Sequence, residues 1–326
     1  MTALLEIENL QTHFKTEGGV VRAVDGVDLK VNEGEVLGIV GESGSGKTVT
    51  ALSALRLVDE PGKIVGGSIR YDGRDVLSMN KKELTQLRGD RISMIFQQPR
   101  VCLNPVISIG RQITELLKQH RDISSKEARN TAISLLNSVG IPDAEKRFSA
   151  YAHELSGGQA QRVMIAIALA LKPRVLIADE PTTALDVTIQ AQIIELLREL
   201  CREMGTALVL VTHDLGVVAE LADRVAVMYA GQVVEETDVE TLFSNPQHPY
   251  TQGLLSSMPV LGQRAERLTA IPGTVPKPSD MPPACRFAPR CKTRISLGMD
   301  ICNQEPPQLL RTAKGSVRCW AIEGAS

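Results

Sequence analysis

The residues best suited to chemistry form a glycine-rich, phosphate-binding pattern early in the chain. Gly41-Glu42-Ser43-Gly44-Ser45-Gly46-Lys47-Thr48 fits the motif G-x-x-x-x-G-K-[ST]. The motif follows the apolar run Val36 to Val40 and precedes the helical pattern Val49 to Leu57, which is the context it requires. The glycines let backbone N–H groups converge on phosphate oxygens, and a helix N-terminus adds about half a positive charge. We expect Lys47 to reach the β- and γ-phosphates of ATP and Thr48 to ligate Mg²⁺.

Two acidic residues follow a second apolar run. Val175 to Ala178 leads directly into Asp179 and Glu180. Because a buried carboxylate is costly unless it is paired or bound to a metal, packing alone does not explain this pair. Beside a phosphate loop, Asp179 fits the outer partner of Mg²⁺. Glu180 then fits the residue that orients or deprotonates the attacking water.

A Ser-Gly-Gly turn opens a third candidate segment. Ser156-Gly157-Gly158-Gln159 precedes the apolar helical pattern Ala160 to Leu171. The turn offers backbone N–H groups, a hydroxyl and the positive end of a helix to an anion. An ordinary helix cap accounts for the same residues, so the turn alone does not establish a ligand site.

Four of the six cysteines gather near the end of the chain, at Cys285, Cys291, Cys302 and Cys319. In a reducing compartment such a group favours metal ligands over disulfides. The spacing lacks the close C-x2-C pairs of structural zinc sites, which makes Zn²⁺ the weaker alternative and leaves unmetallated thiols as a third. Four thiolates can hold an iron–sulfur cluster, whose negative charge nearby basic residues would compensate: Arg286, Arg290, Lys292, Arg294 and Arg318.

The elements that position these residues alternate between strand and helix. Val36 to Val40, Val175 to Ala178 and Ala207 to Val211 are typical of buried parallel strands, and Val187 to Met204 is typical of a helix stopped by Gly205. This alternation predicts an α/β sheet core. Helical spacing at Arg111 to His120 and Ser125 to Val139 predicts an inserted helical subdomain at about residues 100–160. Frequent prolines after Asn245 predict a separate extension over residues 246–326, after a domain of residues 1–245.

Composition narrows the function further. The chain has 326 residues, is 43% hydrophobic and carries a formal net charge of −2, so neither disorder nor an electrostatically held nucleic acid is expected. No apolar run approaches the roughly 20 residues that cross a bilayer. The start, Met1-Thr2-Ala3-Leu4-Leu5-Glu6, lacks a basic region followed by an apolar stretch. We therefore expect a cytosolic protein that reaches a membrane only through partners.

Leu155-Ser156-Gly157-Gly158-Gln159 resembles the signature of ABC-type ATPases. The resemblance implies a P-loop NTPase core of the ABC type, whose signature contacts the nucleotide held by the opposite protomer. It also implies that Gln97 senses Mg²⁺ and contacts the membrane partner, and that His213 is the switch histidine near the γ-phosphate. Ala184-Leu185-Asp186 would cross the dimer interface. Phe14 resembles the aromatic residue that stacks on adenine, although a core position would account for it equally well.

Two further segments narrow the resemblance to the ATP-binding proteins of dipeptide and oligopeptide (peptide/nickel) importers. They are Thr182-Thr183-Ala184-Leu185-Asp186-Val187-Thr188-Ile189-Gln190-Ala191-Gln192 and Asn245-Pro246-Gln247-His248-Pro249-Tyr250-Thr251-Gln252. The resemblance implies a [4Fe-4S] cluster on the cysteine-bearing tail and a peripheral position on the cytoplasmic face of the membrane. It implies three kinds of partner. They are a second ATPase subunit, which is usually a different chain; two integral membrane permease subunits; and an external solute-binding protein.

Two other functions compete with transport. A soluble ABC ATPase acting in macromolecular assembly or repair would carry the same ATP-site motifs. Such proteins normally insert a long coiled coil or a zinc module before the signature, and this chain has no sustained heptad run. A metal-binding regulatory module with a degenerate ATP site is disfavoured because Glu180 and His213 are intact.

Overall fold

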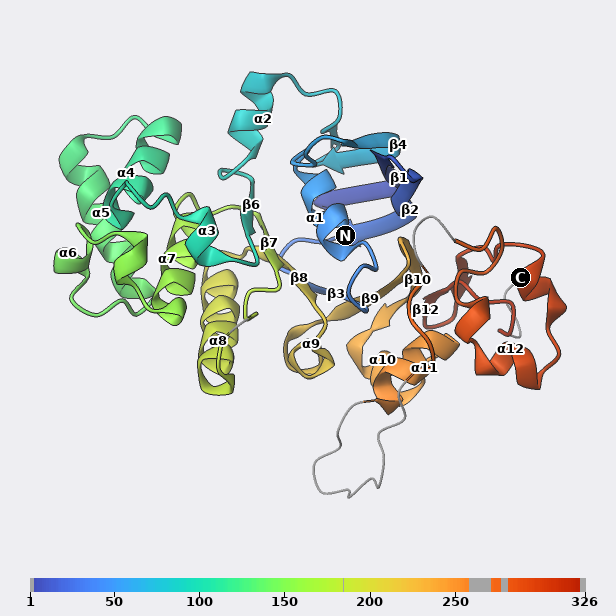
Figure 1. Cartoon of the computed structure of the whole chain (residues 1–326). Helices are drawn as coiled ribbons and strands as arrows, with labels where there is room; N and C mark the ends of the chain where they lie inside the picture. Colours follow the sequence, from blue (N-terminus) through green and yellow to red (C-terminus); the bar gives the residue numbers. More distant parts are fainter. Residues whose placement is uncertain (1–2, 184, 258–270, 277–280, 323–326) are drawn as a thin grey trace. The chain divides into compact units, whose positions relative to one another are not determined.

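The computed structural model describes residues 3–183, 185–257, 271–276 and 281–322 (Figure 1). These residues form two compact units, each built from segments that are discontinuous in the sequence. We call one the signature unit, since it contains Ser156 to Gln159; it comprises Met1–Leu5, Val31–Val36 and Ser78–Val211. We call the other the phosphate-loop unit; it comprises Glu6–Lys30, Leu37–Leu77 and Thr212–Ser326.

The signature unit contains three parallel strands. They are β6 (Ile92–Ile95), β7 (Val175–Asp179) and β8 (Ala207–Thr212), with β7 in the middle. Every residue of these strands is buried, as is typical of parallel strands covered on both faces. The strands expected at Val175 to Ala178 and Ala207 to Val211 are confirmed, and each runs one residue further.

Helices form the rest of the signature unit. They are α2 (Lys81–Leu87), α3 (Pro99–Cys102), α4 (Ile109–His120), α5 (Ser125–Ser138), α6 (Ala144–Arg147), α7 (Gly157–Leu169) and α8 (Val187–Met204), with the 3-10 turn η1 at Ala152–Glu154. The helices expected from apolar spacing correspond to α4 and α5 within two residues. The prediction for α8 is confirmed at both ends, and Gly205 terminates it with a left-handed φ of 65°.

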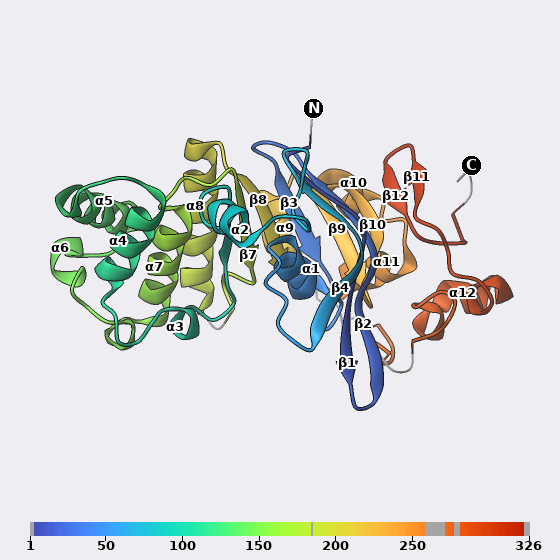
Figure 2. The ribbon, with the colours of Figure 1, turned by 90° about the horizontal axis from the view of Figure 1, so that it is seen from above.

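The phosphate-loop unit contains strands of a mixed sheet and a second sheet of four strands. In the mixed sheet the order is β11 (Leu310–Thr312), β12 (Gly315–Val317), β10 (Gln232–Asp238), β9 (Arg224–Tyr229) and β3 (Val36–Val40). Only β3 and β9 of this set run parallel. The second sheet has the order β2 (Gly19–Val31), β1 (Leu5–Thr16), β4 (Gly62–Tyr71) and β5 (Arg74–Asp75), and Figure 2 shows its long strands side by side. The sequence analysis did not anticipate this second sheet.

Helices also lie between these strands. They include α1 (Lys47–Ala54), α9 (Leu215–Leu221), α10 (Val239–Ser244) and α11 (Pro249–Ser256). Helix α1 begins two residues before the pattern Val49 to Leu57 and ends three residues before its end. The early start follows from the phosphate loop, because Gly46 precedes the helix with a left-handed φ of 101°. Pro249 opens α11, the position in a helix that proline tolerates best.

The last described elements of the chain include two strands that join the sheet containing β10. After α11 come the 3-10 turn η3 (Ala288–Arg290), α12 (Lys292–Ser296), the 3-10 turn η4 (Asp300–Asn303), and strands β11 and β12. Strand β12 pairs antiparallel with β10, with Val317 opposite Glu235. Val317 is 3% exposed, so its burial joins the last strands to the sheet that contains β9. Among the described residues, no helix combines the length and the apolar character needed to span a bilayer.

Candidate functional site

The phosphate loop is a turn in which glycine is required at two points. The loop connects β3 to α1. A Cβ atom on Gly41 would lie 2.2 Å from the Met228 carbonyl oxygen, and one on Gly46 would lie 2.4 Å from the Ala23 carbonyl oxygen. Both glycines also have positive φ, where other residues are strained. Strands β2 and β9 therefore fix the loop from outside, and only glycine fits between them.

Lys47 lies over the loop that precedes it. Its ammonium donates to the carbonyl oxygens of Gly41, at 2.8 Å, and Glu42, at 3.1 Å. The residue is 5% exposed, so its charge stays at the N-terminal end of α1. A buried ammonium and a helix N-terminus at one point favour an anion with several oxygen acceptors, such as a phosphate chain. Thr48 is exposed at the first turn of α1.

Two further predicted residues lie in the phosphate-loop unit. Phe14 is half-buried near the end of β1, and its ring packs so closely on Gly62 that a Cβ there would lie 2.5 Å from a ring carbon. His213 is exposed in the turn between β8 and α9. That turn is fixed on both sides of His213: the Asp214 N–H donates to the Thr212 hydroxyl at 3.0 Å, and the Asp214 carboxylate caps α9.

In the signature unit, the two acidic residues differ in conformation. Asp179 is the last residue of β7 and is 3% exposed. Glu180 follows it with a φ of 45°, a left-handed conformation that non-glycine residues seldom adopt. The Glu180 N–H donates to the Val211 carbonyl oxygen of β8 at 2.8 Å, which holds this conformation in place. Strain of this kind is common where a side chain must be aimed precisely.

The Glu180 carboxylate is bound by two donors. Gln97 donates through Nε2 and Thr183 through its hydroxyl, each at 2.8 Å from the same oxygen, Oε2. Gln97 is exposed two residues beyond β6, and β6 is hydrogen-bonded to β7. The structure thus brings together Gln97 and Glu180, which are 83 residues apart. The sequence analysis did not identify Thr183. The one signal for it in the sequence is its position three residues after Glu180.

The Ser-Gly-Gly turn forms a capping box at the start of α7. The Ser156 hydroxyl accepts from the Gln159 N–H at 3.2 Å, and the Gln159 side chain accepts from the Ser156 N–H at 3.1 Å. A Cβ on Gly158 would lie 3.0 Å from Ile189 of α8, which explains the small residue there. The helix predicted from Ala160 begins at Gly157 because of this cap.

The loop expected to cross a dimer interface is described only in part. Ala184 lies outside the described residues. Asp186 caps α8 by accepting from the Ile189 N–H at 3.0 Å. The segment therefore leads directly into the helix that packs against the signature glycines.

The four clustered cysteines, which we call the cysteine centre, line one cavity. Cys285, Cys291, Cys302 and Cys319 share it with His248, Arg294 and Trp320, among others. All four are free thiols, and none is fully exposed. Burial raises the pKa of Cys285 and of Cys302, and raises the pKa of Cys319 to about 11. These three thiols stay protonated at neutral pH unless a bound metal displaces the proton.

Several groups in the cysteine centre would stabilise negative charge on or beside the cysteine sulfurs. Backbone N–H groups donate to two sulfurs, from Arg294 to Cys291 Sγ at 3.3 Å and from Ala321 to Cys319 Sγ at 3.4 Å. The Arg294 Nε atom is buried without a hydrogen-bond partner. Among the described residues, however, no three His, Cys, Asp or Glu side chains are arranged to hold a single metal ion.

The basic residues near the cysteines differ from the expectation. Of the five expected to compensate a cluster, only Arg294 lines the cavity. Arg286 instead binds Asp25, Arg290 binds Glu42, and Arg318 donates to backbone carbonyls. The reason is burial: a guanidinium removed from water needs several acceptors, and the neighbouring core supplies them.

Comparison with protein families gives two matches. Residues 24–183 match the family model described as "ABC transporter", and residues 234–297 match "Oligopeptide/dipeptide transporter, C-terminal region". The second match includes Cys285 and Cys291 but not the other two cysteines of the centre.

Curated relatives match nearly the whole chain. The oligopeptide transport ATP-binding protein AppD of Bacillus subtilis is 52% identical over 325 residues, which covers 99% of this chain and 98% of that protein. The dipeptide transport ATP-binding protein DppD of Escherichia coli is 50% identical over 313 residues, which covers 96% and 94%.

Solved structures share the fold of most of the chain. The ATP-binding cassette MJ0796, solved as a dimer in a post-hydrolysis state with ADP and Pi, is 31% identical with a TM-score of 0.65; the match covers 72% of this chain and 98% of that one. CbiO1 of Clostridium perfringens is 28% identical with a TM-score of 0.63, covering 75% and 92%. The fold class expected from sequence, an α/β cassette, is therefore confirmed.

Proposed function

This chain is an ATPase of the ABC transporter family, and from that premise we propose that it powers the import of oligopeptides or dipeptides through a membrane transporter. The observation that carries the proposal is the match of residues 234–297 to the C-terminal region of oligopeptide and dipeptide transporters. A cassette serving assembly or repair has no need of such a region. The near-complete coverage of peptide-import relatives supports the same function.

We assign the ATP-site roles as follows. Lys47 and the loop amides bind the β- and γ-phosphates, and Phe14 stacks on adenine. Thr48, Gln97 and Asp179 bind or sense Mg²⁺. Glu180 orients the attacking water, and the bonds from Gln97 and Thr183 to its carboxylate support this assignment, since they fix the orientation of the side chain. His213 contacts the γ-phosphate.

The proposal also includes partners. Ser156 to Gln159 would contact nucleotide bound to a second ATPase subunit, a different chain in most such importers. Two permease subunits would dock near Gln97, where Val101 is 75% exposed and Val106 is 79% exposed, apolar surface that suits a protein partner. An external solute-binding protein would deliver the peptide.

The chain would then lie on the cytoplasmic face of the membrane. Its nucleotide-binding domain would comprise residues 1–245, with the helical part at about 100–160, and its extension would comprise residues 246–326.

Replacing Glu180 with Gln tests the catalytic assignment. The amide keeps the size of the side chain but cannot accept a proton, so hydrolysis should fall about 10²–10⁴-fold while ATP still binds. Single-turnover hydrolysis and ATP affinity are measured on the purified protein, with Glu199→Gln, on the C-terminal half of α8, as the control. Hydrolysis at the wild-type rate by Glu180→Gln would remove Glu180 from the reaction. Peptide uptake by cells that contain the whole transporter tests the cargo separately.

We further propose that the cysteine centre holds a [4Fe-4S] cluster rather than Zn²⁺. The four thiols around one cavity, the two N–H···S bonds and the buried Arg294 Nε fit an iron–sulfur cluster that carries net negative charge. The spacing of the four cysteines, which lacks the close C-x2-C pairs of structural zinc sites, favours a cluster over Zn²⁺. When bound, the cluster would cross-link segments that have little regular structure of their own.

Anaerobically purified protein tests this second proposal. We expect about four iron atoms and four acid-labile sulfides per chain, with broad visible absorbance. Cys102→Ser, at an exposed cysteine outside the centre, should leave these values unchanged, whereas Cys302→Ser should abolish them. Zinc in place of iron, or neither metal, would overturn the assignment.

A further inference from the structure

We propose that Arg290 and Tyr250 are positioning residues of the phosphate loop, through which the C-terminal extension sets the affinity of the loop for nucleotide. The inference rests on the proposed role of the loop in ATP binding. It goes beyond that role because both residues lie in the extension, more than 200 residues from the motif. Their common target is Glu42, the second residue of the loop.

The first contact is a bidentate ion pair in which the arginine is buried. Arg290 Nη1 lies 2.6 Å from Glu42 Oε2, and Nη2 lies 3.0 Å from Oε1. The Arg290 side chain is 4% exposed, whereas that of Glu42 is 32% exposed. Parallel hydrogen bonds between a guanidinium and a carboxylate fix both distance and orientation. The pair therefore restrains the direction of the Glu42 side chain as well as its position.

Arg290 is itself held rigidly. Its Nε donates to the Pro272 carbonyl oxygen at 2.9 Å, and its guanidinium lies 5.7 Å from the centre of the Tyr229 ring. The hydrogen bond to Glu42 is also the main cause that raises the pKa of Arg290, so the charge is permanent. Because the Arg290 side chain is hydrogen-bonded at Nε and at both Nη atoms, the position of its backbone determines the position of the Glu42 carboxylate.

The second contact acts on the backbone of the loop. The Tyr250 hydroxyl accepts from the Glu42 N–H at 2.9 Å. Tyr250 is fully buried, and its ring packs against Tyr229 and Phe287, at centroid distances of 4.7 and 5.5 Å. This amide thus points at Tyr250, although the sequence analysis placed Glu42 among the ATP-binding residues. We therefore assign Glu42 an indirect role: it sets the orientation of the neighbouring loop amides.

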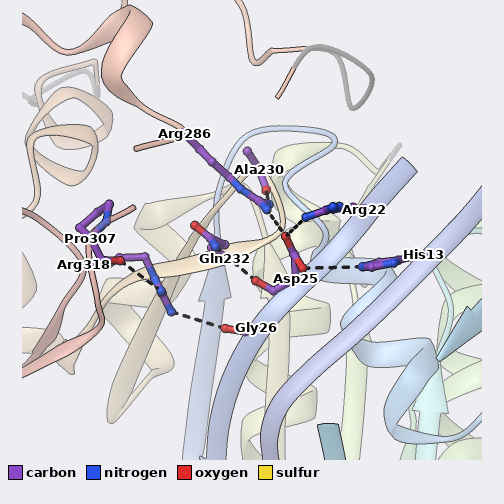
Figure 3. Close-up of polar contacts among 9 residues, drawn as sticks. All are labelled: His13, Arg22, Asp25, Gly26, Ala230, Gln232, Arg286, Pro307 and Arg318. Carbon is purple, nitrogen blue, oxygen red and sulfur yellow. Dashed lines mark hydrogen bonds and ion pairs between the residues drawn. The ribbon is translucent and has the colours of Figure 1, made fainter. Parts of the chain in front are cut away.

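The cysteine centre supplies the rigid base for these contacts. Arg286 follows Cys285, Arg290 precedes Cys291, and Arg318 precedes Cys319. Figure 3 shows two of these arginines reaching the core: Arg286 binds Asp25 and the Ala230 carbonyl, and Arg318 reaches the Gly26 and Pro307 carbonyls. Three of the four cysteines are therefore adjacent to an arginine that binds the phosphate-loop unit around them.

Only one of these arginines reaches the phosphate loop, which provides an internal control. Arg286 is nearly as buried as Arg290, at 9% exposure, and it also pairs with a carboxylate. Its partner, Asp25, belongs to β2 and not to the loop. Arg286→Gln and Arg290→Gln should disturb the extension similarly, but only the second removes a restraint on Glu42.

The test measures ATP and ADP affinity by calorimetry on the full purified chain. We expect Arg290→Gln and Glu42→Gln each to weaken binding by about tenfold, because each breaks the same charged hydrogen bonds. The double variant should bind no more weakly than either single variant, the result expected of two residues that act only through each other. In steady-state hydrolysis, KM for ATP should rise while kcat stays near the wild-type value.

Two results would overturn the proposal. One is wild-type affinity in Arg290→Gln or in Glu42→Gln; the second variant alters a partly exposed residue, so it should fold even where the first does not. The other is an equal loss of affinity in Arg286→Gln, which would assign the effect to general loosening of the extension. If the wild-type chain itself binds no ATP, the proposed function fails instead, so the two failures are distinguishable.

Discussion

The phosphate loop takes its ligand groups from eight consecutive residues, whereas the cysteine centre takes its four thiols from residues spread between 285 and 319. In the loop, sequence neighbours fix one another: Lys47 folds back onto the carbonyls of Gly41 and Glu42. In the cysteine centre, by contrast, the residues next to the cysteines bind outside the centre. The arginines beside the cysteines attach these segments to the core. A site built locally is coded by its own motif, while a site built by packing depends on contacts that no motif records.

This difference predicts opposite consequences for binding and for stability. Changes in the loop should remove ligand affinity and leave the fold intact. Changes in the cysteine centre should reduce the free energy of unfolding and reach the ligand only through Glu42. The following three substitutions separate these outcomes, beginning with the largest effect.

Lys47→Ala should weaken ATP binding by at least about 100-fold, because it removes the charged donor that we assign to the β- and γ-phosphates. The midpoint of thermal unfolding should change little, since the bonds lost are within the loop itself. Calorimetry and thermal melts measure the two quantities on the same sample. Lys63→Ala, at an exposed position of β4, is the matched control. Wild-type affinity in Lys47→Ala would place the nucleotide elsewhere.

The sequence specified the loop because its requirements are local. The motif, the preceding strand and the following helix are contiguous, and a Cβ at Gly41 or Gly46 would collide with backbone. The same holds for the Ser156 capping box and for the stop at Gly205. The resemblance to a family, not the residues alone, linked Gln97 to the site of Glu180, 83 positions away.

The rest was not predictable from pattern, because it depends on partners distant in the sequence. The arginines beside the cysteines were expected to balance a cluster, yet three of them bind the core. Arg290 and Glu42 are 248 positions apart, and charge alone does not select one carboxylate among 38 acidic residues. The sheet around β1 was missed for a related reason: its alternating burial is irregular, with Asn9 and Gly26 at positive φ.

Cys302→Ser should lower the free energy of unfolding by at least about 2 kcal/mol, since it places a hydroxyl at a 7% exposed position and removes a ligand of the proposed cluster. Chemical denaturation measures this loss, and ATP affinity should fall by less than it does in Lys47→Ala. Cys102→Ser, at an exposed cysteine of α3, should change stability by no more than about 0.5 kcal/mol. If Cys302→Ser kept wild-type stability but bound no ATP, the cysteine centre would govern ligand affinity and not stability, which would contradict the comparison.

Tyr250→Phe should have the smallest effect, and it acts where the two regions meet. The substitution keeps the buried ring against Tyr229 and Phe287 and removes only the hydroxyl that accepts from the Glu42 N–H. Burial raises the pKa of Tyr250, so the hydroxyl is neutral and its loss removes one uncharged hydrogen bond.

The Glu42 N–H then loses one uncharged hydrogen bond, and we expect a loss of about 1 kcal/mol in stability and about threefold in ATP affinity. Tyr151→Phe, at an exposed tyrosine of the signature unit, should change neither. If Tyr250→Phe leaves ATP affinity unchanged while Arg290→Gln lowers it, the extension positions the loop through the Glu42 side chain alone. A threefold loss of affinity for both ATP and ADP would instead show that the extension also holds the Glu42 backbone amide in place.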